Sequence, residues 1–338
     1  MIREACFKIT EECPCNCTFC DSNYKYKEVL KQKIMDLGQW KVICDKLIEQ
    51  GISAVVISGG EPLLHVELTL SVVDYLRKNG VYVVLNTSGV LFKDVNLLEK
   101  VIHTPPNLIV FSVDSYIGEK HDLNRRMPGL FERMIHSIRY FKEKSDISVG
   151  IRTVITKNNF RELPNIITFF GELGIDCIKL TNIENDVDGL FRLDYDELVE
   201  FNEIIRPEMC KAIHKICQSE ENLEINIANV AGLLGNIEDY ATISEGLFSP
   251  TYTGNRKCCL NGHFVTIQSN GDILPCCEAE HHYYPILGNL LRDEIKTIIS
   301  SDVYNKFLNN RLEYCTRCTQ NLNYQLSFTE STRTVERR

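Results

Sequence analysis

Six short apolar runs alternate with helical patterns over about the first 180 residues, and this alternation constrains the fold more than any other feature. Alternation of this kind is typical of a parallel sheet covered by helices. We therefore predict an α/β fold: a partial (β/α)6 barrel of the TIM type, followed by a small α+β domain. The expected strands span 5–9, 53–58, 81–85, 108–113, 148–155 and 177–180, and the expected helices span 37–50, 66–79, 95–102, 129–142 and 163–173.

Polar and glycine-rich motifs follow the ends of these strands. A cysteine loop follows the first strand, Gly59-Gly60-Glu61-Pro62 the second, Asn86-Thr87-Ser88-Gly89 the third, and Asp114 the fourth. In parallel barrels the functional site is built at the C-terminal ends of the strands. We therefore expect these motifs to share one site.

The chain divides into four expected units. The barrel spans 1–182, a connector that covers the barrel mouth spans 183–256, a second domain spans 257–320, and a polar tail spans 321–338. The connector contains a helical pattern over 195–217, interrupted at Pro207, and an extended piece over 223–228. In the second domain, Ser269-Asn270-Gly271-Asp272 lies between the apolar segments 264–268 and 273–274, which predicts a β-hairpin. A helix is expected over 292–309.

Composition and charge limit the compartment and the partners. The 338 residues carry a net charge of −9, which argues against nucleic acid as the main partner. No apolar run is long enough to span a membrane, and the N-terminus has no signal-peptide pattern. We therefore expect a cytoplasmic protein. In such a chain, fifteen cysteines indicate metal binding rather than disulfides.

Three cysteines, Cys13, Cys17 and Cys20, have the spacing C-x3-C-x2-C. Thiolates of one short loop can converge on an iron–sulfur cluster. Three ligands on a four-iron cube leave one iron without a protein ligand, free to bind another molecule. A zinc site is the alternative, because Cys15 can supply a fourth thiolate.

Together with Gly59-Gly60-Glu61-Pro62 at the end of the second strand, this spacing resembles the radical S-adenosylmethionine (SAM) superfamily. The resemblance includes Phe19, the aromatic residue just before the third cysteine. It implies that the open iron of a 4Fe–4S cluster chelates the methionine part of SAM. The residues implied to contact SAM are Phe19, Gly59, Gly60, Glu61, Pro62, Asn86, Ser88, Ser112, Asp114 and Arg152.

Residues 257–318 resemble the SPASM/twitch extension found in part of this superfamily. The resemblance rests on Cys259-Leu260-Asn261-Gly262, Gly271-Asp272-Ile273-Leu274-Pro275-Cys276 and Cys315-x2-Cys318. It implies one auxiliary 4Fe–4S cluster held by Cys259, Cys276, Cys315 and Cys318. Because Cys258 adjoins Cys259 and Cys277 adjoins Cys276, either cysteine of each pair can be the cluster ligand. A zinc-ribbon site is the alternative to the iron–sulfur cluster.

The resemblance implies reductive cleavage of SAM to a 5′-deoxyadenosyl radical, which abstracts a carbon-bound hydrogen from the substrate. The electron would come from a one-electron reductant such as flavodoxin or ferredoxin. Loss of an electron to the auxiliary cluster would give oxidation or cross-linking. Return of a hydrogen from a thiol would give epimerisation. The candidate thiols are Cys210, Cys217, Cys258 and Cys277, whereas Cys177 opens the sixth strand and is expected to be structural.

Two substrate classes remain open. The first expectation is modification of a ribosomally made peptide. The alternative is a dehydrogenase or epimerase of a small hydroxylated metabolite, an aminocyclitol or a sugar, in natural-product biosynthesis. The chain starts directly at the first expected strand, so no leader-binding domain is expected before it. The third hypothesis belongs to a different functional class, a non-enzymatic zinc-binding protein.

Overall fold

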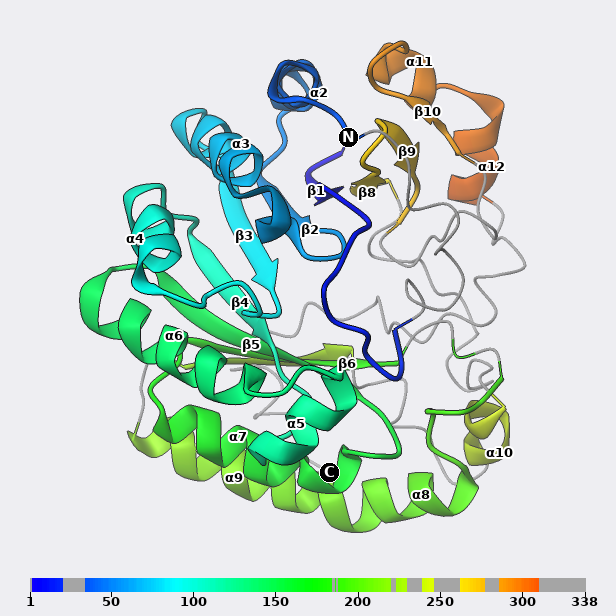
Figure 1. The fold of residues 1–338 in the computed structure, drawn as a ribbon. Helices are drawn as coiled ribbons and strands as arrows, with labels where there is room; N and C mark the ends of the chain where they lie inside the picture. The colour runs from blue at the N-terminus through cyan, green and yellow to red at the C-terminus, as the bar shows by residue number, and fades with distance from the viewer. Residues whose placement is uncertain are drawn as a thin grey trace.

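The computed structural model describes residues 2–20, 34–183, 186, 188–219, 223–229, 239–245, 262–276 and 286–309. Figure 1 shows a curved sheet with helices on its convex side. The described strands form one ten-stranded sheet in the order β10-β9-β8-β1-β2-β3-β4-β5-β6-β7. Strands β1 to β7 pair in parallel, which confirms the predicted partial barrel. The strands span Glu4–Lys8 (β1), Ala54–Ser58 (β2), Tyr82–Thr87 (β3), Leu108–Ser112 (β4), Ser148–Ile155 (β5), Cys177–Asn182 (β6), Glu224–Asn229 (β7), Phe264–Ile267 (β8), Asp272–Leu274 (β9) and Gly288–Asn289 (β10).

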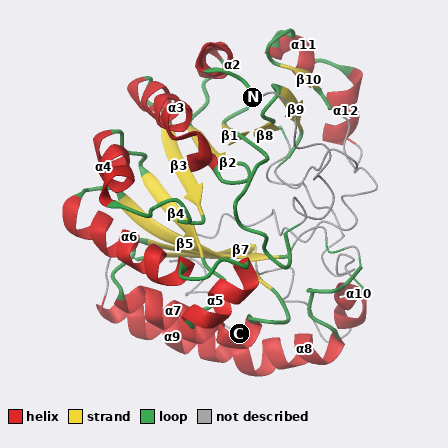
Figure 2. Cartoon of the chain, viewed as in Figure 1, coloured by secondary structure: helices red, strands yellow, loops and turns green. Residues whose placement is uncertain are grey.

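The helices follow the strands in the predicted alternation, as the colouring of Figure 2 shows. Helix α2 begins with a capping box, in which Asp36 and Gln39 satisfy each other's backbone N–H groups. The helical segments span Leu37–Glu49 (α2), Pro62–His65 (η1), Val66–Lys78 (α3), Val95–His103 (α4), Gly118–Arg125 (α5), Leu130–Lys144 (α6), Phe160–Glu162 (η2), Leu163–Glu172 (α7), Tyr195–Glu200 (α8), Phe201–Ile205 (η3), Arg206–Ser219 (α9), Tyr240–Ser244 (α10), Ile295–Ile299 (α11) and Asp302–Asn309 (α12).

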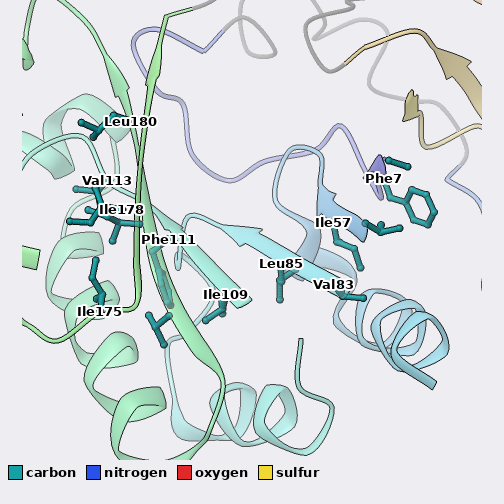
Figure 3. Close-up of a cluster of buried hydrophobic side chains, with 14 of the residues drawn as sticks. Phe7, Ile57, Val83, Leu85, Ile109, Phe111, Val113, Ile175, Ile178 and Leu180 are labelled. Carbon is teal, nitrogen blue, oxygen red and sulfur yellow. The ribbon is translucent and has the colours of Figure 1, made fainter. Parts of the chain in front are cut away.

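Alternate strand residues face the helices and form the main core. Figure 3 shows Phe7, Ile57, Val83, Leu85 and Ile109 in this layer. Phe7 stacks on Trp40 of α2, with ring centroids 4.9 Å apart. Because side chains alternate across a strand, the residues between these positions face the concave side of the sheet, the barrel lumen.

Three elements differ from the sequence-based expectations. Strand β3 continues through Asn86 and Thr87, which were expected to follow it. Helix α5 was not expected, because its sequence GEKHDLNR has a single aliphatic residue and no apolar stripe. The extended piece of the connector is β7, which pairs in parallel with β6 and so extends the sheet.

The described part of 257–320, which was expected to form a second domain, continues the barrel sheet. Strand β8 pairs in parallel with β1, and it forms the predicted hairpin with β9. The helix expected over 292–309 is instead two short helices, α11 and α12. The expected interruption near Pro207 takes the form of a π-helical turn, η3, which lies between α8 and α9. Proline lacks the N–H that a regular helical bond requires.

In the described part of the chain, no helix is both long enough and apolar enough to cross a membrane.

Candidate active site

The cysteine loop is held against the end of α5 by backbone hydrogen bonds. The N–H of Asn16 donates to the carbonyl of Arg125 at 3.3 Å, and the N–H of Thr18 donates to the carbonyl of Asn124 at 2.9 Å. These carbonyls belong to the last turn of the helix, where backbone acceptors have no partner within the helix. The helix that the sequence did not reveal therefore positions the loop.

The Gly-Gly-Glu motif docks directly against the start of the same loop. The N–H of Gly60 donates to the carbonyl of Thr10 at 2.7 Å, and the N–H of Glu61 donates to the carbonyl of Glu12 at 2.8 Å. A Cβ added at Gly60 would lie 2.1 Å from the Glu12 oxygen, and one at Gly59 would lie 2.2 Å from the Thr10 oxygen. Only glycine permits this approach of two backbones.

Glu61 is buried, with 1 % of its surface exposed, and its carboxylate supports the loop after β3. It accepts hydrogen bonds from the Thr87 hydroxyl at 2.8 Å and from the Ser88 N–H and hydroxyl at 2.8 and 2.6 Å. Burial raises the pKa of Glu61, and these hydrogen bonds oppose that effect. Through these hydrogen bonds the Glu61 carboxylate fixes the position of the loop that carries Ser88.

A buried ion pair lies beside the cysteines. Arg125 Nε and Nη2 donate to the two carboxylate oxygens of Asp114 at 3.0 and 2.7 Å. Burial is the largest influence and opposes the positive charge of Arg125. The charge and hydrogen bonds of Asp114, together with the nearby Cys17 and Cys15, outweigh burial and raise the arginine pKa above its ordinary value. Such a two-point pair fixes the guanidinium in one orientation. Arg125 therefore presents a permanent positive charge near Cys15 and Cys17.

A cavity of about 330 Å³ lies between the cysteine loop and the C-terminal ends of the strands. It brings together ten of the residues named from the sequence: Cys13, Cys17, Phe19, Cys20, Gly59, Gly60, Asn86, Ser88, Ser112 and Arg152. It also includes residues that the sequence analysis did not assign to it: Cys15, Ser58, Thr87, Val110, Arg125, Val154, Asn182 and Ile183.

The other named residues lie elsewhere. Glu61, Pro62 and Asp114 are buried behind the cavity wall and do not line it. Cys210 and Cys217 lie on α9, which packs on α7 outside the barrel, and neither lines the cavity. Cys177 is buried at the start of β6, in a small apolar cluster with Val84 and Leu108. Cys276 is buried near the end of the β8–β9 hairpin, whereas Cys258, Cys259, Cys277, Cys315 and Cys318 lie outside the described residues.

The thiol of Cys17 is buried beside Cys15 in the cysteine loop. A hydrogen bond with Cys15 and burial raise the pKa of Cys17 well above its usual range. Metal binding must therefore release a proton at this thiol. Among the residues that the structure describes, no three His, Cys, Asp or Glu side chains are arranged to hold a single metal ion. In a cube each cysteine binds a different iron.

The site fits an iron–sulfur cluster with a bound small molecule. Three cysteines of one loop face the same cavity, and the opposite wall offers the glycine backbone, Ser112 and Arg152. Arginine and backbone groups suit a ligand that carries a carboxylate and an ammonium group.

Family models match both halves of the chain. A model described as "Radical SAM superfamily" matches residues 7–170, and a model described as "Iron-sulfur cluster-binding domain" (SPASM) matches residues 258–319. The second match includes all the cysteines that were assigned to an auxiliary cluster. Both models describe iron–sulfur proteins rather than zinc proteins.

Curated relatives match most of the chain at low identity. An "AdoMet-dependent heme synthase" of Methanosarcina barkeri is 24% identical over 85% of this chain and 79% of its own length. A "PqqA peptide cyclase" of Gluconobacter oxydans is 23% identical over 88% of this chain and 75% of its own length.

Solved structures have the same fold. The structure of "anSMEcpe with bound AdoMet and Cp18Cys peptide" has a TM-score of 0.67 and 17% identity, with 99% of this chain and 95% of that chain covered. Streptococcus suis SuiB "bound to precursor peptide SuiA" has a TM-score of 0.67 and 18% identity, with 95% and 70% covered.

Proposed function

Because the chain belongs to the radical SAM superfamily and carries a SPASM-type iron–sulfur domain, we propose that it modifies a ribosomally made peptide. Its cofactors are SAM and 4Fe–4S clusters. When bound, they supply a 5′-deoxyadenosyl radical that abstracts a carbon-bound hydrogen. The observation that supports SAM chemistry at this site is the cavity that joins Cys13, Cys17 and Cys20 to the strand-end glycines.

We assign roles to the residues of the cavity by their chemistry. Cys13, Cys17 and Cys20 hold the SAM-binding cluster. Arg152 and Ser112 contact the methionine carboxylate, because the guanidinium matches a carboxylate in two-point fashion. The carbonyls of Gly59 and Gly60 accept from the ammonium group. Phe19, whose ring packs edge-on against Phe191 with centroids 6.5 Å apart, contacts the adenine.

Two buried carboxylates act indirectly in this assignment. Glu61 positions Ser88 through its hydrogen bonds, and Asp114 positions Arg125. Both carboxylates were expected from the sequence to contact SAM. Their burial supports a positioning role for both of them.

A peptide substrate is supported by the kinds of protein that resemble this chain. The peptide cyclase relative, and the SuiB and anSMEcpe structures with bound peptides, all act on or bind peptides. The heme synthase relative favours the second candidate, a small non-peptide substrate. A coding sequence for a short precursor peptide beside this gene would support the first candidate. Sugar or aminotransferase genes there would support the second.

The outcome that we propose is oxidation or cross-linking. Epimerisation requires a thiol that reaches the substrate, and the described candidates Cys210 and Cys217 do not line the cavity. Product formed in D2O should therefore carry no solvent deuterium at the reacting carbon. Deuterium there would instead favour epimerisation, with Cys258 or Cys277 as the donor.

Replacement of Cys13, Cys17 and Cys20 by alanine tests the core of the proposal. The variant should form no 5′-deoxyadenosine when supplied with SAM and dithionite under anaerobic conditions. Cys217→Ser, which changes a thiol on the outer helix α9, should retain SAM cleavage. Retained cleavage in the triple variant would reject the assignment.

A further inference from the structure

Three cations project into the barrel lumen from β1, β5 and β6. Phe7 packs outward on Trp40, so its neighbour Lys8 faces the lumen. Arg152 lines the cavity, and Lys179 is its direct partner in the β5–β6 register. Residues paired in a parallel register lie on the same face of the sheet, so Lys179 also faces the lumen.

The two lysines lie at the level of the SAM cavity. Lys8 pairs with Ser58 in the β1–β2 register, and Ser58 lines the cavity. Lys179 pairs with Arg152, which lines it as well. Both lysine side chains are only partly exposed. Neither lysine lines the cavity itself, so the two side chains border the adjoining part of the same barrel layer, from β1 on one side and β6 on the other.

Charges of both signs border the lumen, because Glu224 pairs with Cys177 in the β6–β7 register and acts together with Lys179 on the Cys177 thiol. Among the described residues, no carboxylate lies within ion-pair distance of Lys8 or Lys179. Burial raises the pKa of the Cys6 thiol to about 11. The charges of Lys8 and Arg152 oppose this rise, and the charge of Glu11 adds to it. A partly buried cation without a counter-charge loses hydration and gains no partner in return.

We propose that Lys8 and Lys179 bind carboxylate groups of the substrate, so that this enzyme takes an acidic substrate. The proposal rests on the proposed function, which assigns Arg152 to SAM, and on the lack of an ion pair between either lysine and a carboxylate of the described residues. Each lysine is a compact charge with three donors on a flexible stem, which suits a carboxylate whose position varies. The carboxylates belong to Asp or Glu side chains of a peptide, or to a free dicarboxylate.

Calorimetry on the anaerobic, cluster-loaded enzyme with SAM tests this inference. The probes are the blocked peptide acetyl-Gly-Glu-Glu-Gly-amide, its Gln-Gln counterpart, and glutarate. We expect the Glu peptide to bind at least about tenfold more tightly than the Gln peptide. The double variant Lys8→Met/Lys179→Met should lose about tenfold in affinity for the Glu peptide. Lys211→Met, which removes an exposed lysine from α9, should change nothing. Tighter binding of glutarate than of the peptide would identify a free diacid as the source.

Other outcomes separate this inference from the proposed function. Equal binding of the Glu and Gln peptides, or unchanged affinity in the double variant, overturns the lysine assignment. Uncoupled formation of 5′-deoxyadenosine should persist in the double variant. Its loss at normal iron content would assign the lysines to SAM instead and also overturn the inference. If the unaltered enzyme forms no 5′-deoxyadenosine, the proposed function fails, whereas carboxylate binding is still judged by calorimetry.

Discussion

Backbone atoms of Gly60, just after β2, lie against the start of the cysteine loop, with the Gly60 N–H 2.7 Å from the Thr10 oxygen. A Cβ at this position would lie 2.1 Å from the Glu12 carbonyl oxygen, so the loop must move if the glycine is replaced. Gly60→Ala should cost about 1–3 kcal/mol of unfolding free energy and lower the iron bound per chain.

The control is Gly51→Ala, at a turn where φ is +80° and no atom lies within 4 Å of the added Cβ. It should cost about 1 kcal/mol through backbone strain alone and leave the iron content unchanged. Normal iron content in the Gly60 variant would show that the close approach does not position the loop.

His121 should make the protein sensitive to acid. Burial, and then the charge of Arg125, lower its pKa from 6.5 to about 2, so the folded protein keeps it neutral. Below pH 6.5 the unfolded chain takes up a proton that the folded chain does not. Stability should therefore fall as the pH falls, by up to about 1.4 kcal/mol per pH unit.

His121→Asn tests this dependence, because the amide oxygen can still accept the hydrogen bond that His121 Nδ1 accepts from the Asp114 N–H at 3.3 Å. Urea unfolding between pH 7 and pH 5 should show a shallower loss of stability in the variant. If the unfolding free energy falls equally with pH in both proteins, His121 does not contribute to the acid sensitivity.

At the residue scale, the sequence singled out residues that line the cavity more readily than the residues that support them. Ten residues named from the cysteine spacing and the strand-end motifs line one cavity, because these motifs follow the C-terminal ends of neighbouring strands, and their roles stay a prediction. Arg125 was missed because nothing nearby in the sequence marks it. Its partner Asp114 is eleven residues away, and only the fold makes the pair.

At the scale of elements, Lys46 joins the barrel to the second domain. Its Nζ on α2 donates to the carbonyls of Leu290 and Asp293 at 3.0 and 2.9 Å, and it lies 3.2 Å from a Glu294 carboxylate oxygen. The Glu294 side chain is largely exposed, so the two carbonyl contacts carry most of the effect.

Lys46→Met should destabilise the protein by about 1–3 kcal/mol, because two carbonyl contacts with a charged donor are lost. It should also increase proteolysis within 286–309. Lys41→Met on the exposed side of the same helix should cost less than about 0.5 kcal/mol. Equal melting temperatures for the two variants would contradict the role of Lys46.

The strands and the long helices were predictable because their apolar periodicity is strong. Helix α5 was not, because it is short and polar and is stabilised by tertiary contacts rather than by an apolar stripe. The pairing of β7 with β6 also could not be predicted from the sequence. A single extended piece after a long insertion does not indicate its neighbour in the sheet, whereas the structure places it beside β6.

At the scale of the whole molecule, metal content distinguishes the two cysteine sets. Two 4Fe–4S clusters predict about eight irons per chain in anaerobically purified protein. The Cys13/Cys17/Cys20→Ala variant should retain about four irons, because the proposed ligands Cys259, Cys276, Cys315 and Cys318 are unchanged. Stoichiometric zinc in a colourless protein would contradict both cluster assignments. Unchanged iron in the triple variant would contradict the assignment of Cys13, Cys17 and Cys20.

The pairing of β1 with β8 has a consequence for how the protein is made. Glu4 pairs with Phe264, so one flank of the first strand has no neighbour until some 260 further residues have left the ribosome. The cysteine loop follows that strand directly. Its three thiols therefore follow a strand that is paired on one side only through most of translation. We expect cluster insertion to follow release of the finished chain, and iron supply to be needed after synthesis rather than during it.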